Sequence, residues 1–137
     1  MQMTDVARFD PPNSLSSARL QSDASVVRRY AELTADFNPI HLDPEFAAGT
    51  PFKTPIIHGT MGLNLLIKSI EATFGGSMPA AEIEIRFTGP VPVGSAIRAG
   101  GKLLDADVCR YEVFVETETG TRVIQGTLAV SSCATRP

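Results

Sequence analysis

The chain has no tryptophan, only two histidines and two cysteines, and few aromatic residues, 7% of 137. No apolar run approaches the ~20 residues of a membrane-spanning helix, which argues against a membrane protein. Lys and Arg form no cluster, and the formal net charge is −3, which argues against a nucleic-acid partner. An anionic cofactor-like substrate such as a CoA thioester is not excluded, because it needs only a few local basic residues.

The two cysteines, Cys109 and Cys133, form no Cys-x-x-Cys pair and no disulfide framework. Both lie in strand-like runs, so we expect free thiols in a reducing compartment. The first residues lack the apolar stretch of a signal peptide. These features together predict a cytoplasmic protein.

A chain of this length fits one domain, and we expect residues 1–137 to form it. A first helix is expected from Ser22 or Asp23, with Val26, Tyr30, Leu33 and Phe37 at helical spacing, ending because of Pro39. A short turn of helix follows over 43–48. A second helix over 58–74 is apolar around most of its circumference, which predicts burial on several sides.

Strand patterns fill the rest of the chain. Residues 81–88 alternate apolar and polar, residues 95–104 and 109–115 carry one apolar face each, and Glu118-Thr119-Gly120-Thr121 predicts a hairpin before the last strand. A short strand over 15–21 is also expected. The order of the elements, with helices first and then an antiparallel meander of about four strands, predicts an α+β domain. We expect the sheet to wrap around the second helix.

The run Asp36-Phe37-Asn38-Pro39-Ile40-His41 is a candidate active site. Pro39 restricts the turn, so the carboxylate of Asp36 and the imidazole of His41 can meet at one small site. A carboxylate beside an imidazole suits proton transfer to and from water. Asn38 can bond to nearby backbone in such a turn.

His58-Gly59 opens the second helix. The first N–H groups of a helix lack internal partners and carry partial positive charge. Gly59 has no side chain to block approach, so its N–H can bind a thioester oxygen as negative charge develops there.

The same residue types could in principle serve two other chemistries. Two histidines and an aspartate could bind zinc, but their spacing matches no usual zinc motif, and we expect no metal. A serine nucleophile is not supported, because no serine lies in a Gly-x-Ser-x-Gly turn.

Residues 30–44, with Asp36-Phe37-Asn38-Pro39-Ile40-His41 inside them, resemble the hydratase motif of the MaoC-like family, the (R)-specific enoyl-CoA hydratases. Pro55-Ile56-Ile57-His58-Gly59 resembles the second block of that family, and residues 86–94 resemble the third. The resemblance covers about residues 22–131. It implies a hot-dog fold, in which an antiparallel sheet wraps one long helix, and a homodimer with a continuous sheet. It implies no cofactor besides the CoA thioester substrate.

The resemblance also assigns roles. Asp36 and His41 would be catalytic, and Gly59 would hold the oxyanion, with His58, Asn38 and Asn64 as further substrate-binding positions. Some hydratases of this family carry a supporting serine on the central helix. The matching position holds Ile67, which cannot form a hydrogen bond, so Asn64 or Thr60 would have to substitute for it.

Three functions are therefore considered. The first is (R)-specific hydration of trans-2-enoyl-CoA to (R)-3-hydroxyacyl-CoA, which feeds polyhydroxyalkanoate synthesis or fatty-acid metabolism. The second is dehydration of 3-hydroxyacyl thioesters on an acyl-carrier protein. The third is a non-catalytic subunit that binds acyl thioesters, since fold alone does not settle function.

Overall fold

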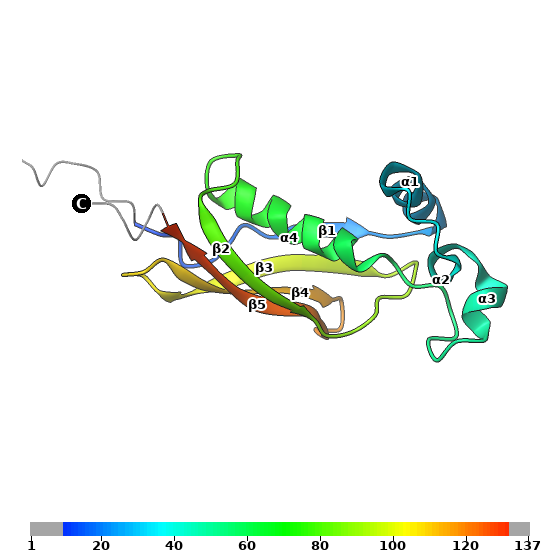
Figure 1. Ribbon diagram of the computed structural model, residues 1–137. Coiled ribbons are helices and arrows are strands. Elements are labelled where there is room, and N and C mark those ends of the chain that lie inside the picture. The colour runs from blue at the N-terminus through cyan, green and yellow to red at the C-terminus, as the bar shows by residue number, and fades with distance from the viewer. Residues whose placement is uncertain (1–9, 132–137) are drawn as a thin grey trace, which may run out of the picture.

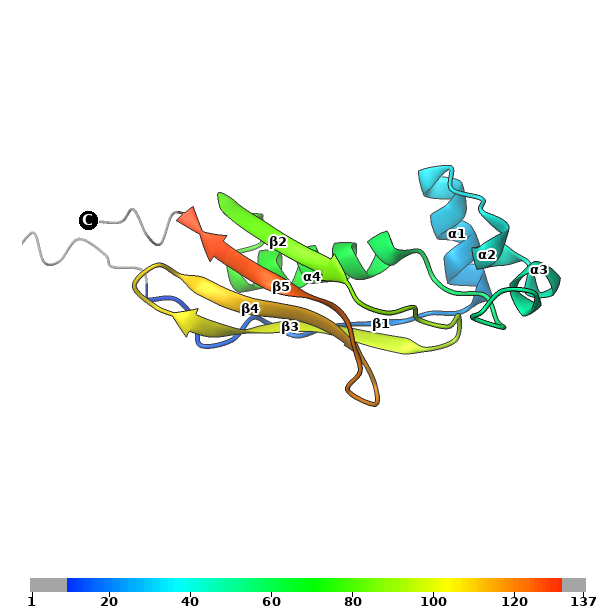
Figure 2. The same ribbon diagram turned by 60° about the horizontal axis from the view of Figure 1, so that its bottom comes forward.

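The computed structural model describes residues 10–131. In these residues, three short helices lie beyond one end of a curved antiparallel sheet, and a longer helix lies across the sheet (Figures 1 and 2). The elements in chain order are β1 (Ala18–Gln21), α1 (Ala24–Thr34), α2 (Pro39–Leu42), α3 (Pro44–Ala48), α4 (Gly59–Thr73), β2 (Ala81–Phe87), β3 (Ala96–Asp105), β4 (Arg110–Thr117) and β5 (Arg122–Val130).

Helix α4 lies close to its expected bounds and is the centre of the core. It packs against β1, β3 and β4. The chain leaves the helix through Gly75 and Gly76, both with positive φ, and the N–H of Gly76 donates to the carbonyl of Glu71 at 2.7 Å. The face of α4 that the sheet covers is apolar apart from one serine and consists of Met61, Gly62, Leu65, Leu66, Ser69 and Ile70.

The sheet differs from the expected meander in the place of β2. Strands β3, β4 and β5 follow one another as neighbours, but the described sheet has the order β1-β3-β4-β5-β2. Strand β2 pairs with β5 over its whole length, from Ala81 opposite Val130 to Phe87 opposite Ile124. The connection after β2 therefore passes β5 and β4 and reaches β3, next to the opposite edge strand β1. Alternation correctly predicts each strand, but it carries no information about which strand is its neighbour.

The inward faces of the strands agree with the pattern. Tyr111, Val113 and Val115 on β4 are fully buried, as is Leu128 on β5. Burial raises the pKa of Tyr111 to about 12, so its hydroxyl stays protonated and donates to the carbonyl of Pro12 at 2.7 Å. This bond ties the segment before β1 to the sheet.

Helix α1 is shorter than expected and buries a different face. It ends at Thr34, because Ala35 adopts the left-handed conformation with φ 55°, so the expectation that Pro39 ends it is wrong. The buried residues are Val27 and Ala31, whereas Leu33 is 84% exposed. Phe37, expected on the same face, lies outside the helix and is also exposed. At the other end, Asp23 caps the helix by accepting from the N–H of Val26 at 2.8 Å.

The structure tests the expected free thiol at Cys109 and also the expectation that the chain has no membrane-spanning helix. Cys109 is fully buried and is disulfide-bonded, so the expectation of a free thiol is wrong for it. Cys133 lies outside the described residues. Within residues 10–131, no helix has the length and apolar character needed to cross a membrane.

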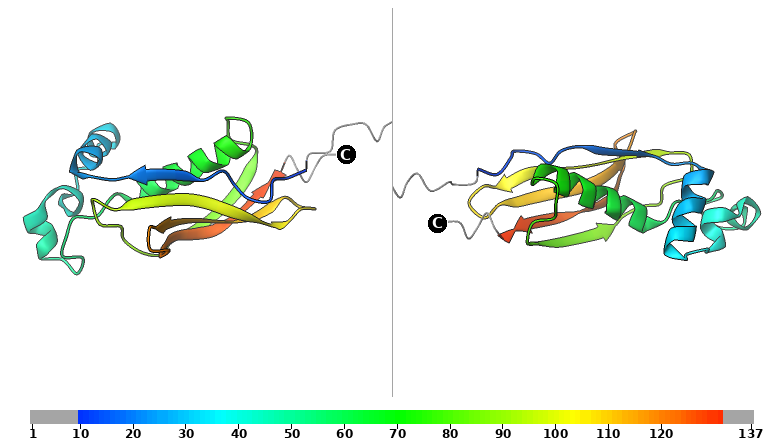
Figure 3. Two further views of the ribbon diagram at one scale, coloured as in Figure 1. Left: turned by 180° about the vertical axis from the view of Figure 1, so that it is seen from behind. Right: turned by 90° about the horizontal axis from the view of Figure 1, so that it is seen from above.

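Helices α1, α2 and α3 gather at the end of the sheet where α4 begins (Figure 3). Their position has a direct consequence for the candidate site. The turn after α1 is brought against the N-terminus of α4, although Asp36 and His58 are 22 residues apart in the chain.

Candidate active site

The turn between α1 and α2 presents Asp36 to solvent. The left-handed Ala35 redirects the chain at the end of α1. The carboxylate of Asp36 then accepts from the N–H of Asn38 at 3.3 Å, and its side chain remains 52% exposed. Asn38 in turn caps α2, because its side-chain oxygen accepts from the N–H of Ile40 at 3.0 Å. Asn38 thus acts on the backbone of this turn.

The turn that the sequence predicts around Pro39 is a short helix, and His41 lies in it, in α2. Its Nδ1 lies 2.8 Å from the carbonyl oxygen of Ile56. A carbonyl oxygen can only accept, so Nδ1 carries the proton in this bond. In the neutral ring, Nε2 then keeps a free lone pair and can serve as a base. The ring is half-buried and lines a cavity next to α4.

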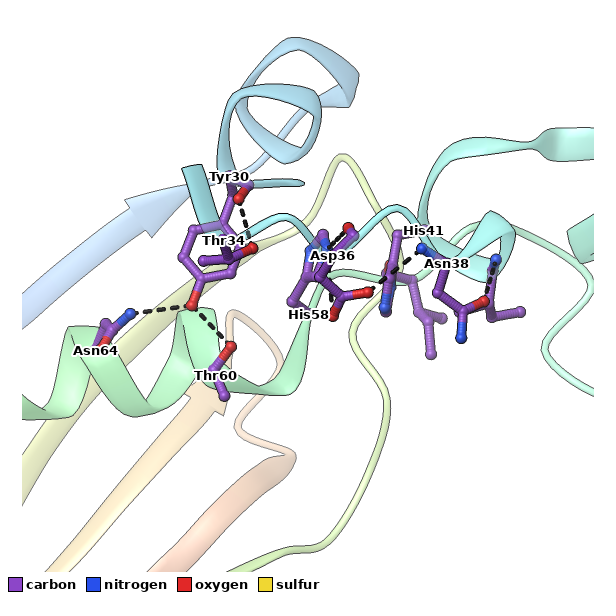
Figure 4. Close-up of polar contacts among 10 residues, drawn as sticks. Tyr30, Thr34, Asp36, Asn38, His41, His58, Thr60 and Asn64 are labelled. Atoms are coloured by element: carbon purple, nitrogen blue, oxygen red, sulfur yellow. Dashed lines mark hydrogen bonds and ion pairs between the residues drawn. The ribbon is translucent and has the colours of Figure 1, made fainter. Parts of the chain in front are cut away.

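His58 is buried and contacts both Asp36 and His41 (Figure 4). Its side chain is only 2% exposed, and its ring stacks on that of His41 with centroids 3.8 Å apart. Its Nε2 lies 3.0 Å from the backbone carbonyl of Asp36 and 3.9 Å from the Asp36 carboxylate. Among the described residues, its Nδ1 has no hydrogen-bond partner. His58 therefore fixes the positions of the two candidate catalytic residues, a role that its sequence context alone did not reveal.

Gly59 is the first residue of α4, and His58 provides no side-chain cap for the helix. The first N–H of the helix has no acceptor within the helix, so it is free to bind a ligand oxygen. A Cβ at position 59 would lie 3.3 Å from the ring of Phe87, so that ring would have to shift by a few tenths of an ångström to admit a side chain. The structure thus places the predicted oxyanion N–H beside the histidine pair.

A cavity of about 360 Å³ runs from this site into the protein. His41, His58 and Gly59 form its polar end. The rest of its wall is mainly apolar and includes Ile57, Phe87, Val91, Ile97, Val123 and Ile124. A ligand with a polar reacting group at one end and an apolar chain at the other fits a cavity with one polar end and an apolar wall.

Tyr30 is a site residue that the sequence assigned only to a helix face. Its ring lies against His58, with centroids 5.0 Å apart. Its hydroxyl donates to Thr60 Oγ1 at 2.7 Å and accepts from the amide of Asn64 at 3.0 Å (Figure 4). Thr60 and Asn64 thereby attach α1 to α4 behind His58.

This network also locates two residues of the central helix that the resemblance singled out. Asn64 does not line the cavity; it lines a separate groove between α1, β1 and α4, so the structure does not bring it to the Asp36/His41 pair. Ile67, at the position of the supporting serine, is half-buried. The polar contact with the backbone of Asp36 comes from His58, and Tyr30 packs against His58 while its hydroxyl bonds to Thr60 and Asn64.

The position of Asn64 leads to a prediction. An Asn64→Ala variant should keep its KM for an enoyl thioester within about twofold, because the amide faces Tyr30 and not the cavity. Loss of one hydrogen bond should lower the free energy of unfolding by about 0.5–1.5 kcal/mol. Steady-state kinetics and urea unfolding measure the two effects. A KM raised tenfold without loss of stability would restore the substrate-binding role.

The same three side chains are also the candidate ligands of a metal ion. Asp36, His41 and His58 each offer a ligand atom, and these atoms lie within 4.8 Å of one another. A metal binds imidazole along the nitrogen lone pair, in the plane of the ring, at about 2 Å. The two rings are stacked at an interplanar angle of 25°, so their lone pairs run side by side instead of meeting at one point. The arrangement suits proton transfer and fits a shared metal poorly.

Comparisons with known proteins agree with this geometry. A family model described as a MaoC like domain matches residues 8–126. The (R)-specific enoyl-CoA hydratase of Aeromonas caviae is 31% identical over 116 residues, which cover 78% of this chain and 84% of that protein. The peroxisomal multifunctional enzyme type 2 of Drosophila melanogaster is 36% identical over 96 residues, 69% of this chain and 16% of that protein.

A third relative, the 3-hydroxyacyl-thioester dehydratase Z of Mycobacterium tuberculosis, is 37% identical over 90 residues. These cover 59% of this chain and 57% of that protein, so the chain spans only part of the fly and mycobacterial relatives. Among solved structures, the (R)-hydratase from A. caviae superposes with a TM-score of 0.70 at 28% identity, covering 87% of this chain and 97% of that one. The expected hot-dog fold is confirmed.

Proposed function

Because the chain belongs to the MaoC-like family, we propose that it is a hydro-lyase that reversibly adds water to a trans-2-enoyl-CoA and yields the (R)-3-hydroxyacyl-CoA. One observation carries the proposal. His41, with its free Nε2, and Gly59, with its unpartnered N–H, line the polar end of an otherwise apolar cavity, and the carboxylate of Asp36 has an oxygen within 4.8 Å of a ring nitrogen of His41. The names of the relatives, hydratases and dehydratases, support the same class of reaction.

The geometry supports a simple sequence of steps. The thioester carbonyl accepts from the N–H of Gly59, which stabilises the negative charge that develops on the oxygen. A water held between Asp36 and His41 gives up one proton to this pair, and the resulting hydroxide adds to C3. The pair returns the proton to C2, so one water is added and no other reactant is consumed. The apolar cavity holds the acyl chain and keeps further water away from it.

The experiment is an assay of the purified protein with crotonyl-CoA, followed as loss of the enoyl thioester absorbance. The product should be oxidised by an (R)-specific and not by an (S)-specific 3-hydroxyacyl-CoA dehydrogenase. Tight binding of acyl-CoA without turnover at any chain length would contradict the proposal and favour a non-catalytic binding subunit.

Dehydration on a carrier protein is the second candidate, favoured by the relative that is named a 3-hydroxyacyl-thioester dehydratase. The same residues would act in the reverse direction. A comparison of CoA-linked and carrier-linked 3-hydroxybutyryl thioesters separates the two candidates. A kcat/KM at least tenfold higher for the carrier-linked substrate would favour the dehydratase.

A homodimer is also proposed, through the edge strand β2. Among the described residues, β2 pairs only with β5, so its other edge has backbone groups open for pairing. A second copy of β2 is a suitable partner, since seven residues can then extend one sheet across both chains. Sedimentation equilibrium measures the mass, and a monomer at micromolar concentration would contradict the dimer.

A further inference from the structure

In the apolar part of the cavity wall, α4 touches β5. Gly62 of α4 and Ile124 of β5 both line the cavity, and both are buried. A Cβ at position 62 would lie 2.9 Å from the Cδ1 atom of Ile124, closer than side-chain carbons normally approach. The helix and the strand are therefore in direct contact at this point of the cavity wall, with no room for a further side-chain carbon between them.

The contact lies close to the reacting end. Gly59 and Gly62 are three residues apart on the same helix, a rise of about 4.5 Å along its axis. Carbon–carbon bonds are about 1.5 Å long. An acyl chain whose carbonyl is bound at Gly59 therefore meets the wall after only a few carbon atoms if it follows the helix.

We propose that the Gly62–Ile124 contact sets the acyl-chain length that the site accepts, with short enoyl chains preferred. The inference rests on the proposed hydratase function and adds a substrate class to it. Ile124 acts as the end wall through its terminal methyl group. Gly62 acts by letting the helix come close enough for that methyl group to close the cavity.

The test compares kcat/KM for trans-2-enoyl-CoA substrates of four, six, eight and twelve carbons. The wild-type protein should prefer four or six carbons. One methylene in an apolar pocket changes discrimination by about 10–200-fold. Ile124→Ala should therefore raise the ratio of eight-carbon to four-carbon kcat/KM at least about tenfold. Gly62→Ala should shift the preference toward four carbons, because its Cβ must push the Ile124 methyl group into the cavity.

Leu128→Ala is the matched control. Leu128 is fully buried on the same strand, four residues from Ile124, and does not line the cavity. Its truncation should lower the melting temperature as Ile124→Ala does, but leave the chain-length preference unchanged. If Ile124→Ala does not fold, Ile124→Val removes only the terminal methyl group and should shift the preference in the same direction.

The kinetic results distinguish a failure of the end-wall assignment from a failure of the proposed hydratase function. An active wild type whose length preference is the same in the Ile124 and Gly62 variants would overturn the end-wall assignment and leave the hydratase proposal standing. A wild type that hydrates none of the four substrates would overturn the proposed function itself.

Discussion

Asp36→Asn and His41→Asn variants are expected to fold normally and to lose hydration of crotonyl-CoA by ~10²–10⁴ in kcat, the usual contribution of general acid–base catalysis. Each substitution removes the reactive group and keeps the structural contact. Asparagine at 36 still accepts from the N–H of Asn38, as the carboxylate does at 3.3 Å. Asparagine at 41 can still donate to the carbonyl of Ile56, the partner of Nδ1 at 2.8 Å, but has no equivalent of Nε2.

Asp43→Asn is the control for the loss of a nearby negative charge. Asp43 caps α3 by accepting from the N–H groups of Glu45 and Phe46, and asparagine is an equally good cap. Its kcat should stay within about twofold of the wild type, since it lies outside the catalytic pair. Circular dichroism and melting temperature verify that all three variants fold. Wild-type rates in folded Asp36→Asn and His41→Asn proteins would rule out the proposed acid–base pair.

The second large effect is expected at Gly59, where the backbone N–H can be deleted. Gly59 is the first residue of α4, a position that proline favours, and His58 already has the extended conformation, with ψ 134°, that precedes proline. Gly59→Pro should therefore preserve the helix while it removes the N–H. Loss of one oxyanion donor should lower kcat ~10²–10³-fold.

Gly59→Ala provides the comparison. Both substitutions place a Cβ about 3.3 Å from the Phe87 ring, but alanine retains the N–H. Kinetics of the two variants should therefore differ mainly in the oxyanion interaction. Equal kcat values for the alanine and proline variants would mean that the Phe87 contact, and not the lost donor, accounts for the change.

The sequence predicts most of the elements because their signals are local. The apolar helix over 58–74 is observed as Gly59–Thr73, and the alternation over 81–88 is observed as Ala81–Phe87. The neighbour of β2 could not be predicted, since its pairing with β5 joins segments about 40 residues apart. The early end of α1 was also unpredictable, because it depends on alanine in the left-handed conformation, which that residue rarely adopts.

For the site, local patterns indicate which residues are involved but not how they support one another. The Asp36/His41 turn and Gly59 were found from their motifs, and the structure brings them together. The stacking of His58 on His41 and the contact with Tyr30 are tertiary interactions between α1, α2 and the start of α4. Tyr30 has helical spacing with apolar residues, so its pattern gave no sign that its hydroxyl joins two helices.

The two histidines of the site are both held by main-chain carbonyls, those of Ile56 and Asp36. Every amino acid supplies the same acceptor at these positions, so the orientation of the rings is insensitive to mutation there. The chemistry at position 36 can consequently change while the scaffold around it persists. Under the proposed mechanism, one substitution at position 36 would separate catalysis from ligand binding, a short evolutionary route from an enzyme to an inactive homologue that still binds its ligand.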